Sequence, residues 1–176
     1  QEEIRKYSPA GKVPVLLDGP LAVWDSLAIG EYLAERHPEL GLWPGDAAER
    51  ARARSLSAEM HSGFTYIREE MPFNCRAIIP GLTFSEGAQE DVARAKAIWR
   101  DCRREHGAGG PWLFGEFTIA DIMYAPVALR FITYGVSLGP SEQAYAEAIQ
   151  AHPAIREWRE GALQEAEMIP QYERGL

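Results

Sequence analysis

The sequence predicts an α+β fold in which a short strand–turn–strand–helix unit precedes a larger all-helical region. Two apolar runs, Val13 to Leu17 and Leu21 to Trp24, are predicted as strands and flank Asp18-Gly19-Pro20, a combination typical of a β-hairpin. The next helical pattern gives way to residues 37–45, a segment that contains proline and glycine and shows no periodicity. Beyond it, apolar residues recur at steps of three and four, as in amphipathic helices. We therefore expect a first unit at 1–36, a linker at 37–45 and a helical domain at 46–176.

Composition narrows the class of protein. The chain has 176 residues, enough to bury a sizeable core. Its net charge of −8 argues against a surface for nucleic acids or anionic membranes, and no apolar run is long enough to span a bilayer. Cys75 and Cys102 lack the spacing of a metal site or a redox pair. We expect two buried small side chains, which suits the reducing cytosol.

The first helix is expected to run from about Ser26 to Arg36, because apolar residues then repeat with helical spacing and His37-Pro38 ends the pattern. The N–H groups and the positive dipole end at Ser26 can bind a carboxylate. Pro14 at the start of a strand indicates a sheet edge, where the backbone of Val13 can pair with an extended peptide. The simpler alternative is an edge-strand proline and a serine that only caps its own helix.

Besides these patterns, two segments of the sequence resemble segments of a known protein family. Ser8-Pro9-Ala10-Gly11-Lys12-Val13-Pro14-Val15-Leu16, followed by Asp25-Ser26-Leu27-Ala28-Ile29-Gly30-Glu31-Tyr32-Leu33, resembles the glutathione-binding half of a soluble, bacterial glutathione S-transferase. In that family the proline after valine is cis, and the valine backbone pairs with the cysteinyl part of glutathione. An acidic residue or glutamine and a serine at the helix start hold the γ-glutamyl group. The resemblance thus implies that glutathione binds at Val13, Pro14, Asp25 and Ser26, with Lys12 facing the glycyl carboxylate.

The same resemblance implies that residues 1–36 are the C-terminal half of a thioredoxin-like α/β domain. In the family, a preceding strand–helix–strand unit carries the Tyr, Ser or Cys that activates the glutathione thiol, and nothing in this chain matches it. We therefore expect the catalytic residue to lie before Gln1 and leave it unidentified.

The helical region is expected to open with a helix that is capped by Asp46 and runs to about Pro72. One apolar face recurs along it, formed by Leu56, Met60, Phe64, Ile67 and Met71. Its segment 59–64 resembles the family helix that lines the cleft and faces the partner subunit. His61, Phe64 and Met71, together with Tyr66, are therefore candidates for the co-substrate pocket. The alternatives are a surface or dimer-contact histidine and ordinary core side chains.

A second helix is expected from Ser85 to about Glu105. The next helix should begin at Thr118, because Thr118 and Asp121 have the spacing of a capping box. With Phe114-Gly115 before it and Tyr124-Ala125-Pro126 after it, this box resembles the folding motif of the glutathione transferase helical domain, a structural role.

The remaining sequence predicts shorter helices. One should span Ser141 to about Gln150 with Ser141 as cap, and another should start at Pro153, break at Gly161 and end near Met168. Residues 169–176 are expected to form a loosely held polar tail.

The resemblance implies a cytoplasmic, homodimeric glutathione transferase that conjugates the glutathione thiolate to a hydrophobic electrophile in detoxification. Glutathione would be its substrate or cosubstrate, with no metal, nucleic acid or membrane involved. Three alternatives stay open: a zeta-like glutathione-dependent isomerase of the maleylacetoacetate type, a thiol–disulfide exchanger, and a non-catalytic binding module with the same fold.

Overall fold

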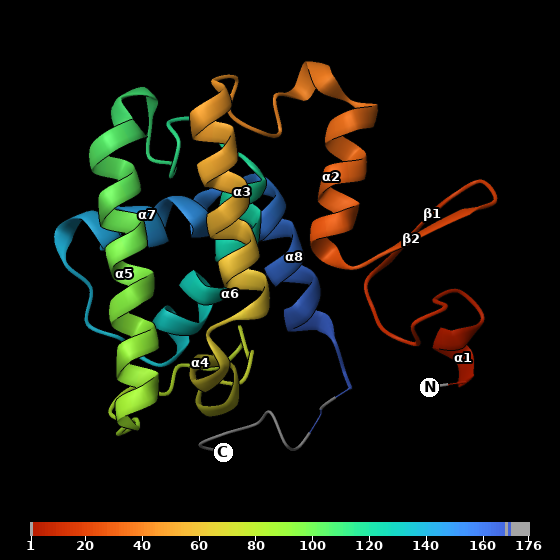
Figure 1. The fold of residues 1–176 in the computed structure, drawn as a ribbon. Coiled ribbons are helices and arrows are strands. Elements are labelled where there is room, and N and C mark those ends of the chain that lie inside the picture. Colours follow the sequence, from red (N-terminus) through yellow and green to blue (C-terminus); the bar gives the residue numbers. More distant parts are fainter. Residues whose placement is uncertain (1, 168, 170–176) are drawn as a thin grey trace.

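The computed structural model describes residues 2–167 and residue 169. A short helix and a hairpin lie beside a helical body, and helix α2 stands between them (Figure 1). In chain order the elements are α1 (Glu2–Arg5), β1 (Val15–Asp18), β2 (Leu21–Trp24), α2 (Ser26–Arg36), the 3-10 turn η1 (Pro38–Leu40), α3 (Ala47–Ser62), α4 (Thr65–Glu70), α5 (Glu86–His106), the 3-10 turn η2 (Gly107–Gly109), α6 (Ile119–Thr133), α7 (Pro140–Ala151) and α8 (Pro153–Gln164). This is the expected α+β arrangement of a hairpin unit followed by a helical region.

The hairpin forms as predicted. Strands β1 and β2 are antiparallel, with Val15 opposite Trp24 and Asp18 opposite Leu21. The turn between them places Gly19 in the left-handed region at φ +57°, a conformation that glycine adopts without a steric penalty. The first strand starts two residues later than expected, because Val13 and Pro14 lie outside the ladder; their peptide bond is cis, as predicted.

Helix α2 is fixed to the helical body by a buried contact and an ion pair. The carboxylate of Glu31 accepts two hydrogen bonds from Arg54 on α3, at 2.8 and 3.0 Å, and one from the indole of Trp43 at 3.1 Å. Arg54 is the main cause of a lowered pKa at Glu31. Gly30 approaches Ile119 so closely that a Cβ there would lie 3.3 Å from its side chain. These contacts set the position of the N-terminal end of α2 relative to α3 and α6.

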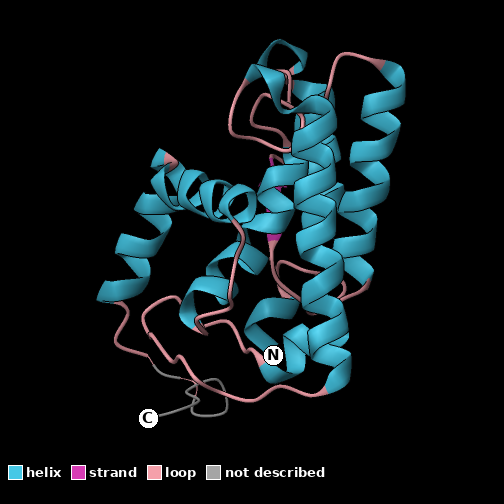
Figure 2. Cartoon of the chain, turned by 90° about the vertical axis from the view of Figure 1, so that its left-hand side faces the viewer, coloured by secondary structure: helices cyan, strands magenta, loops and turns pink. Residues whose placement is uncertain are grey.

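The helical body is held by aromatic packing. Helix α3 packs on α6, and α7 packs on both α5 and α6 (Figures 1 and 2). Trp99, fully buried on α5, contacts rings from two other helices: its ring centroid lies 4.9 Å from Tyr145, 5.3 Å from Phe131 and 6.4 Å from Tyr124. Close-packed rings of this kind contribute beyond their buried area.

The helix expected to run from Asp46 to Pro72 is two helices. Asp46 caps α3 by accepting from the amides of Ala48 and Glu49, as predicted, but α3 ends at Ser62. Phe64 then takes a left-handed φ of +54° before α4 begins. Periodicity missed this break because α4 resumes with the same face inward.

Three boundaries of the last two helices also differ from the sequence prediction. Helix α7 begins at Pro140 with Gly139 as its N-cap, so Ser141 does not cap it; proline suits the first helical position. Helix α8 passes through Gly161 without a break and ends at Gln164, and residues 165–167 are not helical. The expected helix end at Met168 lies outside the described residues. Of the expected tail at 169–176, the structure describes residue 169.

The capping box at the start of α6 is confirmed. The carboxylate of Asp121 accepts from the amide of Thr118 at 2.9 Å and from its hydroxyl at 3.2 Å. Its other oxygen accepts from the amide of Leu113 at 3.0 Å, which ties the preceding loop to the helix. The side chain is fully buried.

Burial makes the stability of the fold depend on the ionisation of Asp121. Burial raises the pKa of Asp121 to about 6, although the amides of Leu113 and Thr118 act in the opposite direction. Between about pH 4 and pH 6 the folded state then holds a proton that the unfolded state has lost. The stabilisation that comes from this proton on Asp121 is complete below the unfolded pKa and disappears as the pH rises through about 6.

We therefore expect the free energy of unfolding of the wild type, relative to Asp121→Asn, to fall between pH 4 and pH 6 and to level off above pH 7. Urea titrations of both proteins at these pH values measure the difference. A difference that does not change with pH would contradict the raised pKa.

Candidate functional site

The N-terminal end of α2 is capped by Asp25. Its Oδ1 accepts from the amides of Leu27 at 2.9 Å and Ala28 at 3.2 Å. Ser26 therefore does not cap its own helix, in contrast to the simpler alternative drawn from the sequence. Within the described part of the chain, the Ser26 amide and hydroxyl donate to no other group, and the residue is exposed. Two hydrogen-bond donors are thus available beside the Asp25 carboxylate.

His61 at the end of α3 reaches the same carboxylate. Its Nε2 lies 2.6 Å from Asp25 Oδ2, so the histidine links α3 to the start of α2. Partial burial raises the pKa of Asp25, but the amides of Ala28 and Leu27 and the imidazole of His61 outweigh it, so the net pKa is lowered. Asp25 is therefore an anion at neutral pH, and its oxygens retain lone pairs for a cationic ligand group.

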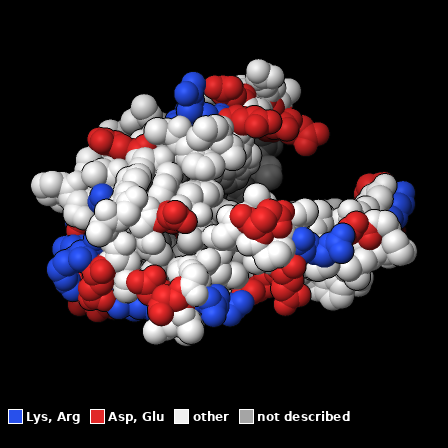
Figure 3. Space-filling model, turned by 90° about the horizontal axis from the view of Figure 1, so that it is seen from above, with Lys and Arg blue, Asp and Glu red and all other residues white. Residues whose placement is uncertain are grey.

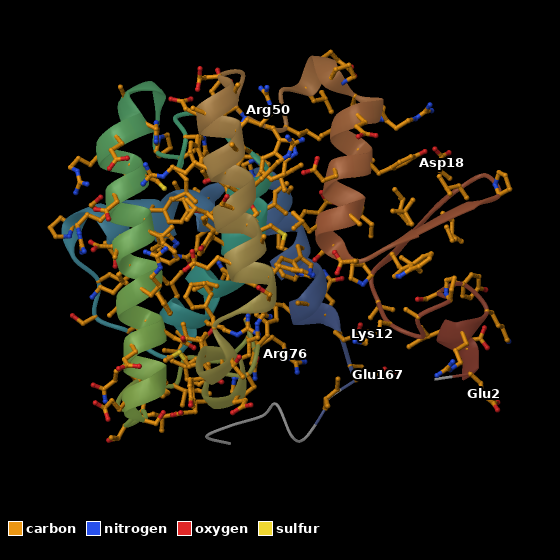
Figure 4. The ribbon with its side chains drawn as sticks, viewed as in Figure 1. Glu2, Lys12, Asp18, Arg50, Arg76 and Glu167 are labelled. Atoms are coloured by element: carbon orange, nitrogen blue, oxygen red, sulfur yellow. The ribbon has the colours of Figure 1, made fainter. Side chains whose placement is uncertain are left out.

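The hairpin register brings the other expected residues to the same end of α2. Because Val15 pairs with Trp24, Val13 and Pro14 enter the hairpin at the same end at which Asp25 and Ser26 leave it. Val13 is 69% exposed. Lys12 is also exposed; in the projection of Figure 4 it lies between the hairpin and the C-terminal end of α8. Four of the five residues expected to bind glutathione therefore lie at the end of the hairpin that adjoins α2, and Lys12 directly precedes them in the chain.

A cavity of about 530 Å³ opens at this place. Its lining comes from α2, α3, α4, the loop after α4, α6 and α8: Ser26, Gly30, Met60, His61, Arg68, Phe73, Ile119, Ile122, Met123, Ala125, Pro126, Arg130, Ile155 and Trp158. The lining is mostly apolar, with few polar groups, which is the usual make-up of a small-molecule site. Ser26 and His61 belong both to the start of α2 and to the cavity.

Two of the expected pocket residues lie elsewhere. Phe64 is 7% exposed and Met71 is fully buried; both belong to the hydrophobic core and neither lines this cavity. The reason is that the apolar face they share points into the body of the protein. Tyr66 is 51% exposed and also lies outside the lining. Of the candidates, only His61 reaches the cavity.

Sequence reasoning missed most of the cavity wall. Arg130 is the one basic residue of the mostly apolar helix α6, a signal that could have marked it. Phe73 and Trp158 stack with ring centroids 5.3 Å apart although they are far apart in the sequence, and nothing local in the sequence indicates that contact. The cavity depends on how α8 brings Ile155 and Trp158 into one lining with residues of α3 and α6.

Two features that the described residues lack bear on the chemistry. Among them, no cluster of three or more His, Cys, Asp or Glu side chains has an arrangement that could hold a metal ion. None of the described helices has the length and apolar character needed to cross a membrane. Acidic and basic side chains are interspersed on the face seen in Figure 3.

Comparison with known proteins gives the same family for both parts of the chain. Residues 1–41 match the family model described as the glutathione S-transferase N-terminal domain. Residues 47–161 match the model of the glutathione S-transferase C-terminal domain. The second match alone covers more than half of the chain.

Several curated proteins are similar over most of this chain. A probable maleylacetoacetate isomerase of Caenorhabditis elegans is 27% identical over 147 residues, which is 80% of this chain and 65% of the relative. One of Vibrio cholerae is 28% identical over 163 residues, covering 87% of this chain and 73% of the relative. The glutathione S-transferase GstB of Escherichia coli K12 is 27% identical over 160 residues, covering 85% and 74%. The chain thus spans about two thirds to three quarters of these proteins.

Solved structures agree on the fold. A glutathione transferase homolog from Burkholderia with bound glutathione superposes with a TM-score of 0.68 at 26% identity, covering 92% of this chain and 78% of that one. A maleyl pyruvate isomerase, described as a bacterial glutathione S-transferase in the zeta class, gives a TM-score of 0.67 at 22% identity, covering 95% and 82%. From the two family models together, this chain belongs to the glutathione S-transferase family.

Proposed function

We propose that the protein is a glutathione transferase, which binds glutathione where the hairpin meets α2 and joins its sulfur to an electrophile held in the adjacent cavity. The observation that carries this proposal is the double role of Ser26. It offers unpaired donors at the start of α2 and also lines the cavity. A ligand bound at Ser26 is therefore next to whatever the cavity holds.

The charges at the start of α2 suit the γ-glutamyl end of the tripeptide. Its α-carboxylate would accept from the Ser26 amide and hydroxyl at the positive end of the helix. Its ammonium group would donate to the Asp25 carboxylate, which His61 holds in place at 2.6 Å. The backbone of Val13, an exposed residue, would pair with the cysteinyl part beside the cis Val13–Pro14 bond, and Lys12 would face the glycyl carboxylate.

The cavity would supply an apolar surface for the electrophile, so that binding both partners side by side raises their effective concentration. The described lining contains no tyrosine or cysteine, and we assign Ser26 to binding. Activation of the thiol is therefore assigned to a group outside this set.

We base our proposals for the oligomeric state, the cellular location and the domain division on the family. We propose a homodimer that acts in the cytoplasm in detoxification, with glutathione as substrate or cosubstrate. We also propose the division into a glutathione-binding unit at 1–36, a linker at 37–45 and a helical domain at 46–176. The family-model limits at 41 and 47 support a linker of this position.

A second candidate is a zeta-like, glutathione-dependent isomerase of the maleylacetoacetate type. The specific observation in its favour is that two of the similar curated proteins are named probable maleylacetoacetate isomerases, at 27% and 28% identity. The binding arrangement would be the same, but glutathione would be regenerated at the end of each turnover.

The proposal predicts that the protein is retained on a glutathione resin, is eluted by free glutathione and catalyses the reaction of glutathione with 1-chloro-2,4-dinitrobenzene. Counting free thiols separates the two reactions, because conjugation consumes one thiol per turnover and isomerisation of maleylacetoacetate consumes none. A protein that passes through the resin and accelerates neither reaction would be a binding module of the same fold and would refute both candidates.

A further inference from the structure

His61 contacts the start of α2 and lines the cavity at the same time. Its Nε2 lies 2.6 Å from Oδ2 of Asp25, and its side chain forms part of the cavity wall. Asp25 itself does not line the cavity, and the described lining contains no aspartate or glutamate. Because a carboxylate can only accept, Nε2 is the nitrogen that donates this hydrogen bond. His61 is therefore the contact between the Asp25 carboxylate and the wall of the cavity.

The backbone that carries His61 is fixed by Arg68 of α4. Arg68 donates from Nη2 to the Met60 carbonyl at 2.8 Å and from Nε to the Gly63 carbonyl at 3.1 Å, on either side of His61 in the chain. The same Nη2 lies 3.4 Å from the carbonyl oxygen of His61 itself. The end of α3 is thus a well-anchored support from which the imidazole reaches α2.

Water reaches the contact between His61 and Asp25. The His61 side chain is 37% exposed and the Asp25 side chain is 41% exposed. A charged contact in water contributes little, because water competes for both groups. The same contact is stronger where water is excluded, since the effective dielectric constant is then lower. A ligand group that covers the imidazole from the cavity side would therefore strengthen the hydrogen bond to Asp25.

A stronger hydrogen bond from His61 would fix the carboxylate that is expected to bind the ammonium group of glutathione. Oδ1 of Asp25 accepts from the amides of Leu27 at 2.9 Å and Ala28 at 3.2 Å, while Oδ2 faces His61. Both oxygens are thus held, and each keeps a lone pair for a further donor. A carboxylate that is already held in place loses less freedom when it binds an ammonium group, so the affinity rises.

We propose that His61 couples the two parts of the site: a ligand group that fills the cavity covers His61, and the covered His61 holds Asp25 more firmly for the ammonium group of glutathione. This inference rests on the proposed function, because it concerns how the same site binds its two substrates. It makes His61 a positioning residue that acts through Asp25. Such coupling is reciprocal, so bound glutathione would also favour occupancy of the cavity.

Four ligands test the coupling: glutathione, S-hexylglutathione, and the two analogues that lack the ammonium group, glutaryl-cysteinylglycine and its S-hexyl derivative. The hexyl chain probes the cavity, and the loss of the ammonium group probes Asp25. Isothermal titration gives the Kd of each ligand. We define the ammonium factor as the Kd without the ammonium group divided by the Kd with it, for the plain pair and for the S-hexyl pair.

In the wild type, the ammonium factor of the S-hexyl pair should exceed that of the plain pair at least about fivefold. His61→Phe keeps a ring in the cavity wall but removes the donor, so it should make the two factors equal. His61→Gln keeps a donor and should retain part of the difference. His37→Ala is the matched control, because His37 Nδ1 lies 3.3 Å from Glu39 Oε1 but the residue does not line the cavity. It should keep the wild-type difference.

The ammonium factors separate positioning from a merely structural role. If His61 only packs at the end of α3, His61→Phe will change the melting temperature or all four affinities alike. The difference between the two ammonium factors would then stay as in the wild type, which would overturn the proposal. Equal factors in the wild type would overturn it without any substitution.

The same titrations distinguish this failure from failure of the proposed function. Binding of glutathione and S-hexylglutathione with equal ammonium factors would overturn only the coupling through His61. Binding of none of the ligands would overturn the proposed function and this inference with it.

Discussion

Replacing Asp121 by alanine is expected to lower the free energy of unfolding by about 4 kcal/mol. The carboxylate accepts from the amides of Thr118 and Leu113 at 2.9 and 3.0 Å, and the whole side chain is buried. Alanine would leave both amides without an acceptor and without access to water. Each buried donor left unpaired costs about 1–3 kcal/mol, so two together exceed the loss of about 1–2 kcal/mol expected from the cap alone.

Equilibrium unfolding in urea measures this loss, and Asp46→Ala is the matched control. Asp46 also caps a helix and also accepts from two amides, but it does so at the exposed start of α3. Water can replace its hydrogen bonds, so we expect a loss of about 1 kcal/mol. Equal losses in the two variants would contradict the special role that burial gives to the box at α6.

Replacing Ser26 by alanine is expected to weaken glutathione binding by about 1–3 kcal/mol. The proposed site gives the γ-glutamyl carboxylate two donors from this residue, the amide and the hydroxyl. Alanine keeps the amide and removes the hydroxyl, which leaves a charged group short of one partner. Because Asp25 rather than Ser26 caps α2, the substitution should leave the helix itself intact.

Isothermal titration of both proteins with glutathione gives the difference in affinity. Ser55→Ala is the control, since Ser55 is an exposed serine of α3 that donates to the Ala51 carbonyl and does not line the cavity. Its affinity should match the wild type. An unchanged affinity in Ser26→Ala would remove Ser26 from the site.

Local chemistry allowed much of the fold to be predicted. The turn at Gly19, the cap at Asp46 and the box at Thr118 and Asp121 each depend on residues within a few positions of one another, and each is present. The break at Phe64 was not predictable in this way. Phe64 combines this left-handed φ with a buried ring that packs against Tyr124 of α6, a contact between residues that are distant in sequence.

The candidate site likewise has one part that could be predicted from local sequence and one part that could not. The start of α2 could be predicted because Asp25 and Ser26 adjoin in sequence and because the segment resembles a known family. The cavity could not, because its wall combines α4, α6 and α8 and no short motif encodes their meeting. Periodicity also drew attention to Phe64 and Met71, since an apolar face that fills a core has the same spacing as one that lines a cavity.

The most direct test of the proposed function is a crystal structure of the protein with glutathione. We expect the γ-glutamyl carboxylate to lie about 3 Å from the Ser26 amide and hydroxyl, with the ammonium on Asp25 and the sulfur at the mouth of the cavity that Arg130 lines. Glutathione bound away from the start of α2, or with its sulfur directed away from the cavity, would contradict it.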